Sequence, residues 1–172
     1  LFFRSGPMTM GASQLCGFTK SDPSLATPNL QFHVAPMSAD KLGGATLHKF
    51  PAFTPTISNI RPTSRGQISI ASNDTRDDPL ITMNYLSTDE DKKIAIKSIK
   101  IVRHIVLNSN AFKSYEPEEM RPGLNLSDDE ILQEVGKYAN TVFHPVGTCR
   151  MGNDEEAVVN DRLLAHGFKG LR

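Results

Sequence analysis

The residue best suited to chemistry in this sequence is His144, which lies in the segment 140–152, NTVFHPVGTCRMG. An imidazole titrates near neutral pH and can accept a proton from a substrate hydroxyl. Pro145 biases the backbone of His144 toward an extended conformation, and Gly147 permits a sharp turn or a close backbone approach two residues later. The segment is therefore predicted to be a shaped loop that aims the imidazole.

Two other interpretations of His144 follow from the same residues. A single histidine before a proline is often a loop residue whose ring nitrogens hydrogen-bond to nearby backbone. A zinc site could use His144 with Cys149, but two ligands fall short of the three or four that zinc sites in proteins use. No metal site is therefore predicted, and the local residues leave catalysis and a structural role both open.

The wider pattern resembles the C-terminal signature of the glucose-methanol-choline (GMC) oxidoreductases, which are flavoproteins that oxidise alcohols. Four blocks carry the resemblance: RPTSRGQISI at 61–70, PLITMNYL at 79–86, HPVGTCRMG at 144–152 and VVNDRLLAHGFKGLR at 158–172. They occur in order and extend over most of the chain, so the resemblance is specific.

The resemblance implies a reaction, a cofactor and site residues. In the family, a basic imidazole removes the hydroxyl proton of a small alcohol while the adjacent carbon passes a hydride to FAD. At the matching position His144 is that catalytic base, whereas His166 falls in a turn and is expected to be structural. Residues 14–18 match a region that lines the substrate cavity. The candidate cofactor contacts are the loop residues Pro145, Val146, Gly147 and Thr148.

The resemblance also implies missing parts. The family's Gly-x-Gly-x-x-Gly loop, which binds the FAD diphosphate at a helix N-terminus, does not occur in the sequence. The family pattern continues past Arg172 into a segment with flavin contacts and a second active-site histidine or asparagine. We therefore expect a fragment that is inactive alone and whose partner is the FAD-binding domain of the same parent protein. The expected division is a substrate-binding domain at 1–138 and the active-site loop with an incomplete segment at 139–172.

Two alternatives to alcohol oxidation stay open. A lyase of the same family would cleave cyanohydrins, as a hydroxynitrile lyase does, with the same histidine and a flavin that stays redox-silent. A free-standing, non-catalytic α+β binding module would form a closed domain without flavin. The identity of the alcohol and the choice between oxidase and dehydrogenase are also open.

The composition narrows the class of protein. The length of 172 residues, with 38% hydrophobic and 22% charged residues, is ordinary for one soluble domain that can bury a hydrophobic core. The 19 basic residues balance 19 acidic ones, so no net charge points to nucleic acid. No apolar run approaches the roughly 20 residues of a membrane span, and Leu1–Arg4 is too short for a signal-peptide core. Cys16 and Cys149 are expected to be free thiols, and the localisation is left open.

Periodicity predicts an α+β fold, a largely antiparallel sheet packed against helices. In the segment 30–35, Leu30, Phe32 and Val34 face the core and His33 faces away from it. A turn at 61–66 is predicted to join strands 56–60 and 67–71 into a hairpin, with Ile68 and Ile70 facing the core. Further strands are expected at 16–19 and 80–86, a long loop at 36–55 around Gly43–Gly44, and helices at 88–107 and 127–138. Basic residues of the first helix, predicted to form a solvated face, are Lys92, Lys93, Lys97, Lys100 and Arg103.

Overall fold

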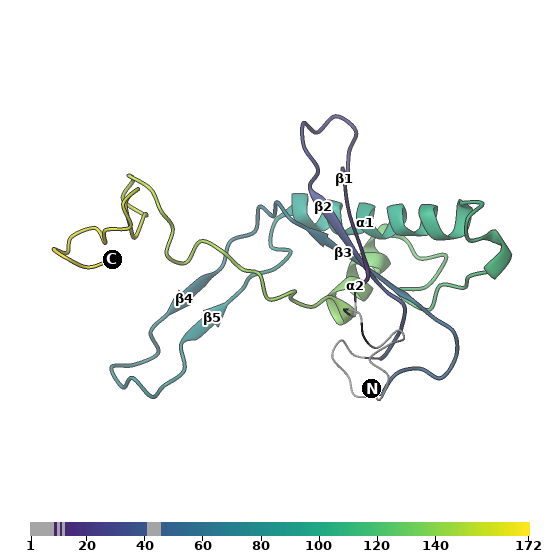
Figure 1. Ribbon diagram of the computed structural model, residues 1–172, viewed down its shortest axis with the longest axis horizontal. Helices are drawn as coiled ribbons and strands as arrows, with labels where there is room; N and C mark the ends of the chain where they lie inside the picture. The colour runs from purple at the N-terminus through teal and green to yellow at the C-terminus, as the bar shows by residue number, and fades with distance from the viewer. Residues whose placement is uncertain (1–8, 10, 12, 41–45) are drawn as a thin grey trace. The chain divides into compact units, whose positions relative to one another are not determined.

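The computed structural model describes residues 9, 11, 13–40 and 46–172 (Figure 1). The chain divides into two compact units, Leu1–Arg65 with Tyr85–Asn140 and Gly66–Asn84 with Thr141–Arg172. The opening residues Leu1–Arg4 and the predicted loop glycines Gly43–Gly44 lie outside the described residues. The expected division of the chain at residue 138 stays a prediction.

The first unit contains a three-stranded antiparallel sheet. Its strands are β1 (Leu15–Thr19), β2 (Leu30–Ala35) and β3 (Thr54–Asn59), in the order β1-β2-β3. The predicted strand at 30–35 is confirmed with the same bounds. The strand predicted at 56–60 is confirmed but begins two residues earlier, at Thr54.

Two helices complete this unit, as predicted, and each begins directly after a residue whose side chain caps it. In α1 (Asp89–Asn108), the Thr88 hydroxyl accepts a hydrogen bond from the Asp91 N–H at 3.3 Å. In α2 (Asp128–Tyr138), Ser127 forms a reciprocal capping box with Glu130. Each cap satisfies backbone donors that the first helical turn leaves without partners. A short 3₁₀ helix, η2 (Lys113–Tyr115), lies in the connection between α1 and α2.

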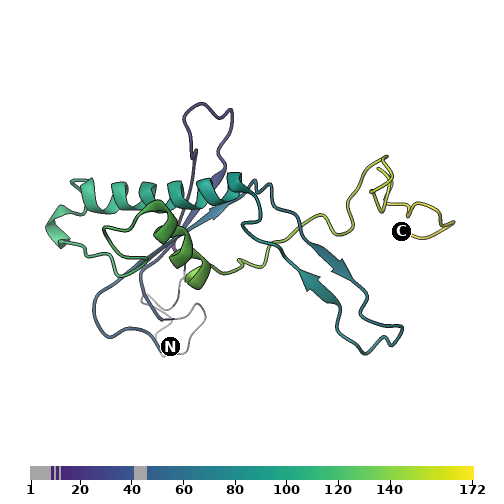
Figure 2. The same ribbon diagram turned by 180° about the vertical axis from the view of Figure 1, so that it is seen from behind.

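The core of the first unit is shared by the sheet and both helices. Leu30 of β2 and Ile131 of α2 are fully buried, and Ile94 of α1 is buried with them. Helix α1 packs against β3 and against α2 (Figure 1; seen from behind in Figure 2). A sheet with helices packed on it is the predicted α+β fold, which is confirmed.

A buried carboxylate joins the sheet to the first turn of α1. The side chain of Asp91 accepts hydrogen bonds from the Asn59 amide at 3.1 Å, the Thr63 N–H at 3.0 Å and the Ser64 N–H at 2.8 Å. Burial raises the pKa of Asp91, but the bonds from Ser64 and Thr63 outweigh it and bring the pKa below its usual value. The turn after β3 is therefore fixed to α1. The Arg65 guanidinium donates to the carbonyl of Pro62 at 2.8 Å, which further ties this turn together.

The prediction that Arg103 is part of a solvated face is wrong. Its guanidinium donates to both carboxylate oxygens of Glu119, at 2.7 and 2.9 Å, and to the carbonyl of Gly123. The two side chains are only 17% and 13% exposed. A planar guanidinium matches a carboxylate with two parallel hydrogen bonds, so Arg103 fixes the loop before α2 onto α1.

The predicted hairpin between segments 56–60 and 67–71 is also wrong, because β3 pairs with β2. Strand β4 (Gln67–Ser69) instead pairs antiparallel with β5 (Leu80–Thr82) in a separate two-stranded sheet of the second unit. Ile68 and Ile70, predicted to face the core, are 51% and 87% exposed, because two strands alone bury neither face of a sheet. Strand β5 ends earlier than predicted, since Asn84 has a positive φ of 55°.

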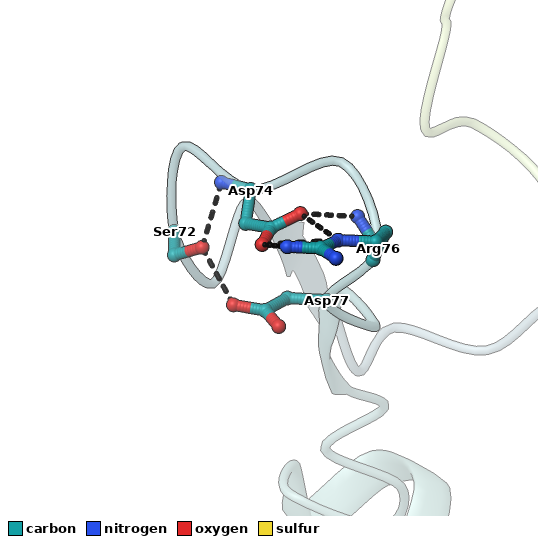
Figure 3. Close-up of polar contacts among 4 residues, drawn as sticks. All are labelled: Ser72, Asp74, Arg76 and Asp77. Atoms are coloured by element: carbon teal, nitrogen blue, oxygen red, sulfur yellow. Dashed lines mark hydrogen bonds and ion pairs between the residues drawn. The ribbon is translucent and has the colours of Figure 1, made fainter.

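Polar contacts organise the tip between β4 and β5 (Figure 3). The Ser72 hydroxyl donates to Asp77 at 2.6 Å and accepts from the Asp74 N–H at 2.9 Å. The Arg76 Nε donates to Asp74 at 2.9 Å, and this pairing lowers the pKa of Asp74. These contacts hold the connection in one conformation and leave its charged groups exposed.

Candidate active-site loop

The segment that carries His144 has no helix or strand, as predicted. Residues 139–150 leave α2 and run as an irregular loop. Two turns shape this loop, at Phe143 with φ 60° and at Gly147 with φ 99°. The Phe143 N–H donates to the Thr141 hydroxyl at 3.0 Å, which stabilises the first turn. A positive φ is strained for a phenylalanine and ordinary for a glycine.

The side chains of the loop point into solvent. His144, Pro145, Gly147 and Thr148 are all exposed, and Val146 is 94% exposed. Within the described part of the chain, the His144 imidazole has no hydrogen-bond partner. The interpretation of His144 as a histidine tied to nearby backbone therefore finds no support in the geometry.

Backbone groups of the loop are equally open. The N–H groups of Val146, Gly147 and Thr148 donate to no acceptor among the residues that the structure describes. A Cβ at Gly147 would meet nothing within 4 Å, although the φ of 99° favours glycine there. The loop thus offers an imidazole, three backbone donors and a hydroxyl to a ligand.

The segment after this loop is folded back on itself. The Val158 N–H donates to the Arg150 carbonyl at 2.9 Å, and the Gly152 N–H donates to the Val159 carbonyl at 2.9 Å. Val159 also forms isolated bridges with Met151 and with Ala165. We call this region, residues 150–171, the C-terminal fold-back, and it fixes the end of the loop.

Gly152 is the tightest position of the C-terminal fold-back. A Cβ there would lie 3.2 Å from the Cβ of Ala157 and 3.1 Å from a guanidinium nitrogen of Arg150. Arg150 pairs with Asp154 through two hydrogen bonds, and this pairing lowers the pKa of Asp154 to about 2. The His166 Nε2 hydrogen-bonds to the carbonyl of Gly152 at 2.9 Å, which agrees with the structural role expected for His166.

A second group of polar side chains lies on the sheet of the first unit. Cys16, His33 and Thr56 are direct neighbours across β1, β2 and β3, on the face opposite Leu30, and the Gln31 amide hydrogen-bonds to the Cys16 sulfur at 3.3 Å. The alternation within 30–35 predicts that His33 leaves the core face. It does not predict Cys16 beside His33, because that neighbour depends on the register between two strands.

The described residues offer neither a metal cluster nor a spanning helix. No three His, Cys, Asp or Glu side chains among them come together as metal ligands. Cys16 and Cys149 are free and exposed, as predicted. Among the same residues, no helix combines the length and apolar character needed to cross a bilayer.

Comparison with known proteins decides the family. The family model of the GMC oxidoreductases matches residues 62–172, which include the whole His144 loop and the C-terminal fold-back. The chain belongs to the GMC oxidoreductase family. The resemblance of the four sequence blocks is thereby confirmed.

Curated relatives extend over nearly all of the chain. An alcohol dehydrogenase [acceptor] of Pseudomonas putida is 40% identical over an alignment 179 residues long, which covers 100% of this chain and 31% of that protein. An oxygen-dependent choline dehydrogenase of Cronobacter sakazakii is 37% identical, with 91% of this chain and 28% of that protein aligned. The chain therefore spans less than a third of the length of these GMC relatives.

Solved structures share the fold. Pyridoxine 4-oxidase from Mesorbium loti superposes with a TM-score of 0.80 at 23% identity, over 93% of this chain and 32% of that one. A formate oxidase of Aspergillus oryzae RIB40, solved for the effect of a mutation on FAD modification, gives a TM-score of 0.84 at 24% identity, over 98% of this chain and 34% of that one. At this identity the likeness shows the fold, and it agrees with the α+β architecture described above.

Proposed function

We propose that this chain is the C-terminal part of a flavoprotein that oxidises an alcohol to an aldehyde or ketone, with His144 as the catalytic base. Membership of the GMC family supports the reaction class, and the relatives named alcohol dehydrogenase and choline dehydrogenase support a small alcohol as substrate. The observation that carries the proposal is the exposed His144 imidazole, which has no hydrogen-bond partner among the described residues.

The loop chemistry suits proton abstraction. A neutral imidazole nitrogen within hydrogen-bond reach of the substrate hydroxyl would accept its proton. Pro145 restricts the backbone of His144, and the turn at Gly147 directs the following residues back. The restricted backbone at His144 leaves less backbone motion to be frozen when substrate binds.

The loop also fits a cofactor contact. FAD, when bound, would supply the hydride acceptor of the reaction. Pro145 and Val146 offer apolar contact, and the N–H groups of Val146, Gly147 and Thr148 offer donors to its polar edge. The chain spans less than a third of the length of its GMC relatives, so we expect the remaining contacts to come from a further domain of the parent protein. The isolated chain is therefore expected to be inactive.

A flavin spectrum and an alcohol-dependent dye reduction test this function on three samples: the chain alone, the whole protein and its His144→Ala variant. We expect the whole protein and its His144→Ala variant to be yellow and the chain alone to be colourless. Only the unchanged whole protein is expected to turn over, because His144→Ala binds flavin without rapid reduction. His104→Gln is the matched control, because His104 is an exposed histidine of α1 whose ring hydrogen-bonds only to Asn108 among the described residues. Normal flavin reduction by His144→Ala refutes the base assignment.

The same samples separate the two alternatives. A yellow whole protein whose flavin no alcohol reduces, but which cleaves a cyanohydrin, is a lyase of the same family. A whole protein that binds no flavin is a binding module. Either result overturns the proposed oxidation.

A further inference from the structure

His166 links the two halves of the C-terminal fold-back. Its backbone N–H donates to the Val158 carbonyl at 3.0 Å, and its ring Nε2 lies 2.9 Å from the carbonyl oxygen of Gly152. A carbonyl oxygen only accepts, so Nε2 carries the proton and donates it. One residue thereby holds the strand-like segment 150–152 against the segment at 158.

Two hydrogen bonds hold the backbone of Gly152, one at its N–H and one at its C=O. Its N–H donates to Val159 at 2.9 Å, while its C=O accepts from the His166 ring. The backbone of Gly152 is also packed so closely against Ala157 that a Cβ would lie 3.2 Å from that side chain. Gly152 is therefore a fixed point of the chain.

The His144 loop runs into this fixed point. Between Phe143 and Cys149 the loop side chains are exposed, and its backbone donors from 146 to 148 have no partner within the described residues. The hydrogen bond from Phe143 to Thr141 shapes the turn at the entry of the loop, and the C-terminal fold-back anchors its exit. The path of the loop that carries His144 thus depends on where Gly152 is held.

We propose that His166 is a positioning residue for His144, acting through the Nε2–H bond to the Gly152 carbonyl. The inference rests on the proposed function of His144 as the base. His166 is not itself the base at this nitrogen, because Nε2 is occupied by Gly152. A displacement of a catalytic group by about 1 Å can lower the rate of the chemical step by roughly 100-fold.

The test is a double-mutant cycle on the whole flavoprotein, with the rate of flavin reduction by an alcohol as the readout. His166→Leu removes the donor and is expected to slow flavin reduction roughly 10- to 100-fold with little change in KM. His166→Gln keeps an N–H donor at a similar reach and is expected to restore most of the rate. In the His144→Ala background, His166→Leu is expected to cause no further loss, because positioning acts through the imidazole of residue 144.

A merely structural role gives a different result. Loss of flavin or of fold would slow the reaction by the same factor with and without His144, and such additivity overturns the inference. A rate of His166→Leu equal to that of the unchanged protein overturns it as well. If His166→Leu fails to fold, the pair His166→Gln and His166→Asn decides, since the shorter asparagine amide cannot span to Gly152: equal rates for the two overturn the inference.

The outcomes also separate this inference from the proposed function. Slow reduction by His144→Ala together with additive behaviour of His166→Leu leaves the base assignment standing and removes the positioning role. Normal reduction by His144→Ala removes both.

Discussion

Replacing Asp91 by asparagine tests the connection between the sheet and α1. The asparagine side chain has nearly the same shape, but it accepts through one oxygen and presents an NH2 group in place of the other. At least one of the three donors, from Asn59, Thr63 and Ser64, would then face a donor. Hydrogen bonds to a charged acceptor contribute about 1.5–3 kcal/mol each, so we expect Asp91→Asn to lower the free energy of unfolding by about 3 kcal/mol at pH 7.

The pH dependence of this effect has a defined sign. The pKa of Asp91 lies below its usual value in the folded state. The ionised carboxylate therefore stabilises the fold fully above the unfolded-state pKa of about 3.9, and this stabilisation is lost as the pH falls through the lower folded-state pKa. Asparagine does not titrate, so the difference between Asp91 and its variant must shrink in acid.

Urea unfolding, monitored by the circular dichroism of the helices, measures both the loss of stability and its pH dependence. The titration is done at pH 7 and again in steps down to about pH 3, near the usual carboxyl pKa. Asp89→Asn is the matched control, because Asp89 lies in the same first turn with a side chain that is 86% exposed. Its substitution should change stability only slightly. Equal losses for the two variants, or a loss at Asp91 that is independent of pH, would falsify the assignment of Asp91 as the connecting group.

Three further substitutions test separate features. Arg103→Met is expected to lower the free energy of unfolding by about 3 kcal/mol in a urea titration, because it leaves the carboxylate of Glu119 buried without its partner. Lys97→Met, which removes one member of an exposed ion pair, should lower it far less in the same titration. Gly66→Ala is expected to open the β4–β5 pairing, since its Cβ would lie 2.2 Å from the Thr82 carbonyl oxygen, and faster hydrogen exchange of the hairpin amides measures this. Ser127→Ala should cost about 1 kcal/mol through loss of the N-cap of α2, and an unchanged urea midpoint contradicts it.

Local features of the fold could be predicted because they depend on near neighbours in sequence. The caps of α1 and α2 follow from a Thr or Ser before acidic residues, since the side-chain oxygen and the first-turn donors are only three residues apart. The alternation of Leu30, Phe32 and Val34 likewise shows strand β2 within a single segment. The irregular loop at His144 follows from Pro145 and Gly147.

Pairing between distant segments could not be predicted in the same way. A short turn favours a hairpin, and the turn at 61–66 is short, yet Thr63 and Ser64 are held by Asp91 of α1 instead. β3 then pairs with β2, and β4 is left to pair with β5. The buried position of Arg103 does not follow from the sequence for a related reason: a basic residue on an amphipathic helix is predicted to be solvated, and only the fold brings a distant carboxylate, here Glu119, against it.

The candidate site combines a loop whose C-terminal end is held in place with polar groups that have no partner among the described residues. The C-terminal fold-back satisfies both peptide groups of Gly152, whereas the imidazole of His144 and the donors at 146–148 are left without partners in the described chain. Exposed polar groups that hydrogen-bond to water cost little free energy. They become costly only if they are buried without a partner. Burial against a cofactor and a hydroxyl would instead satisfy them, and the fixed exit would keep the imidazole at the required angle. This division between a fixed fold-back and an exposed loop is what the role proposed for His144 would need.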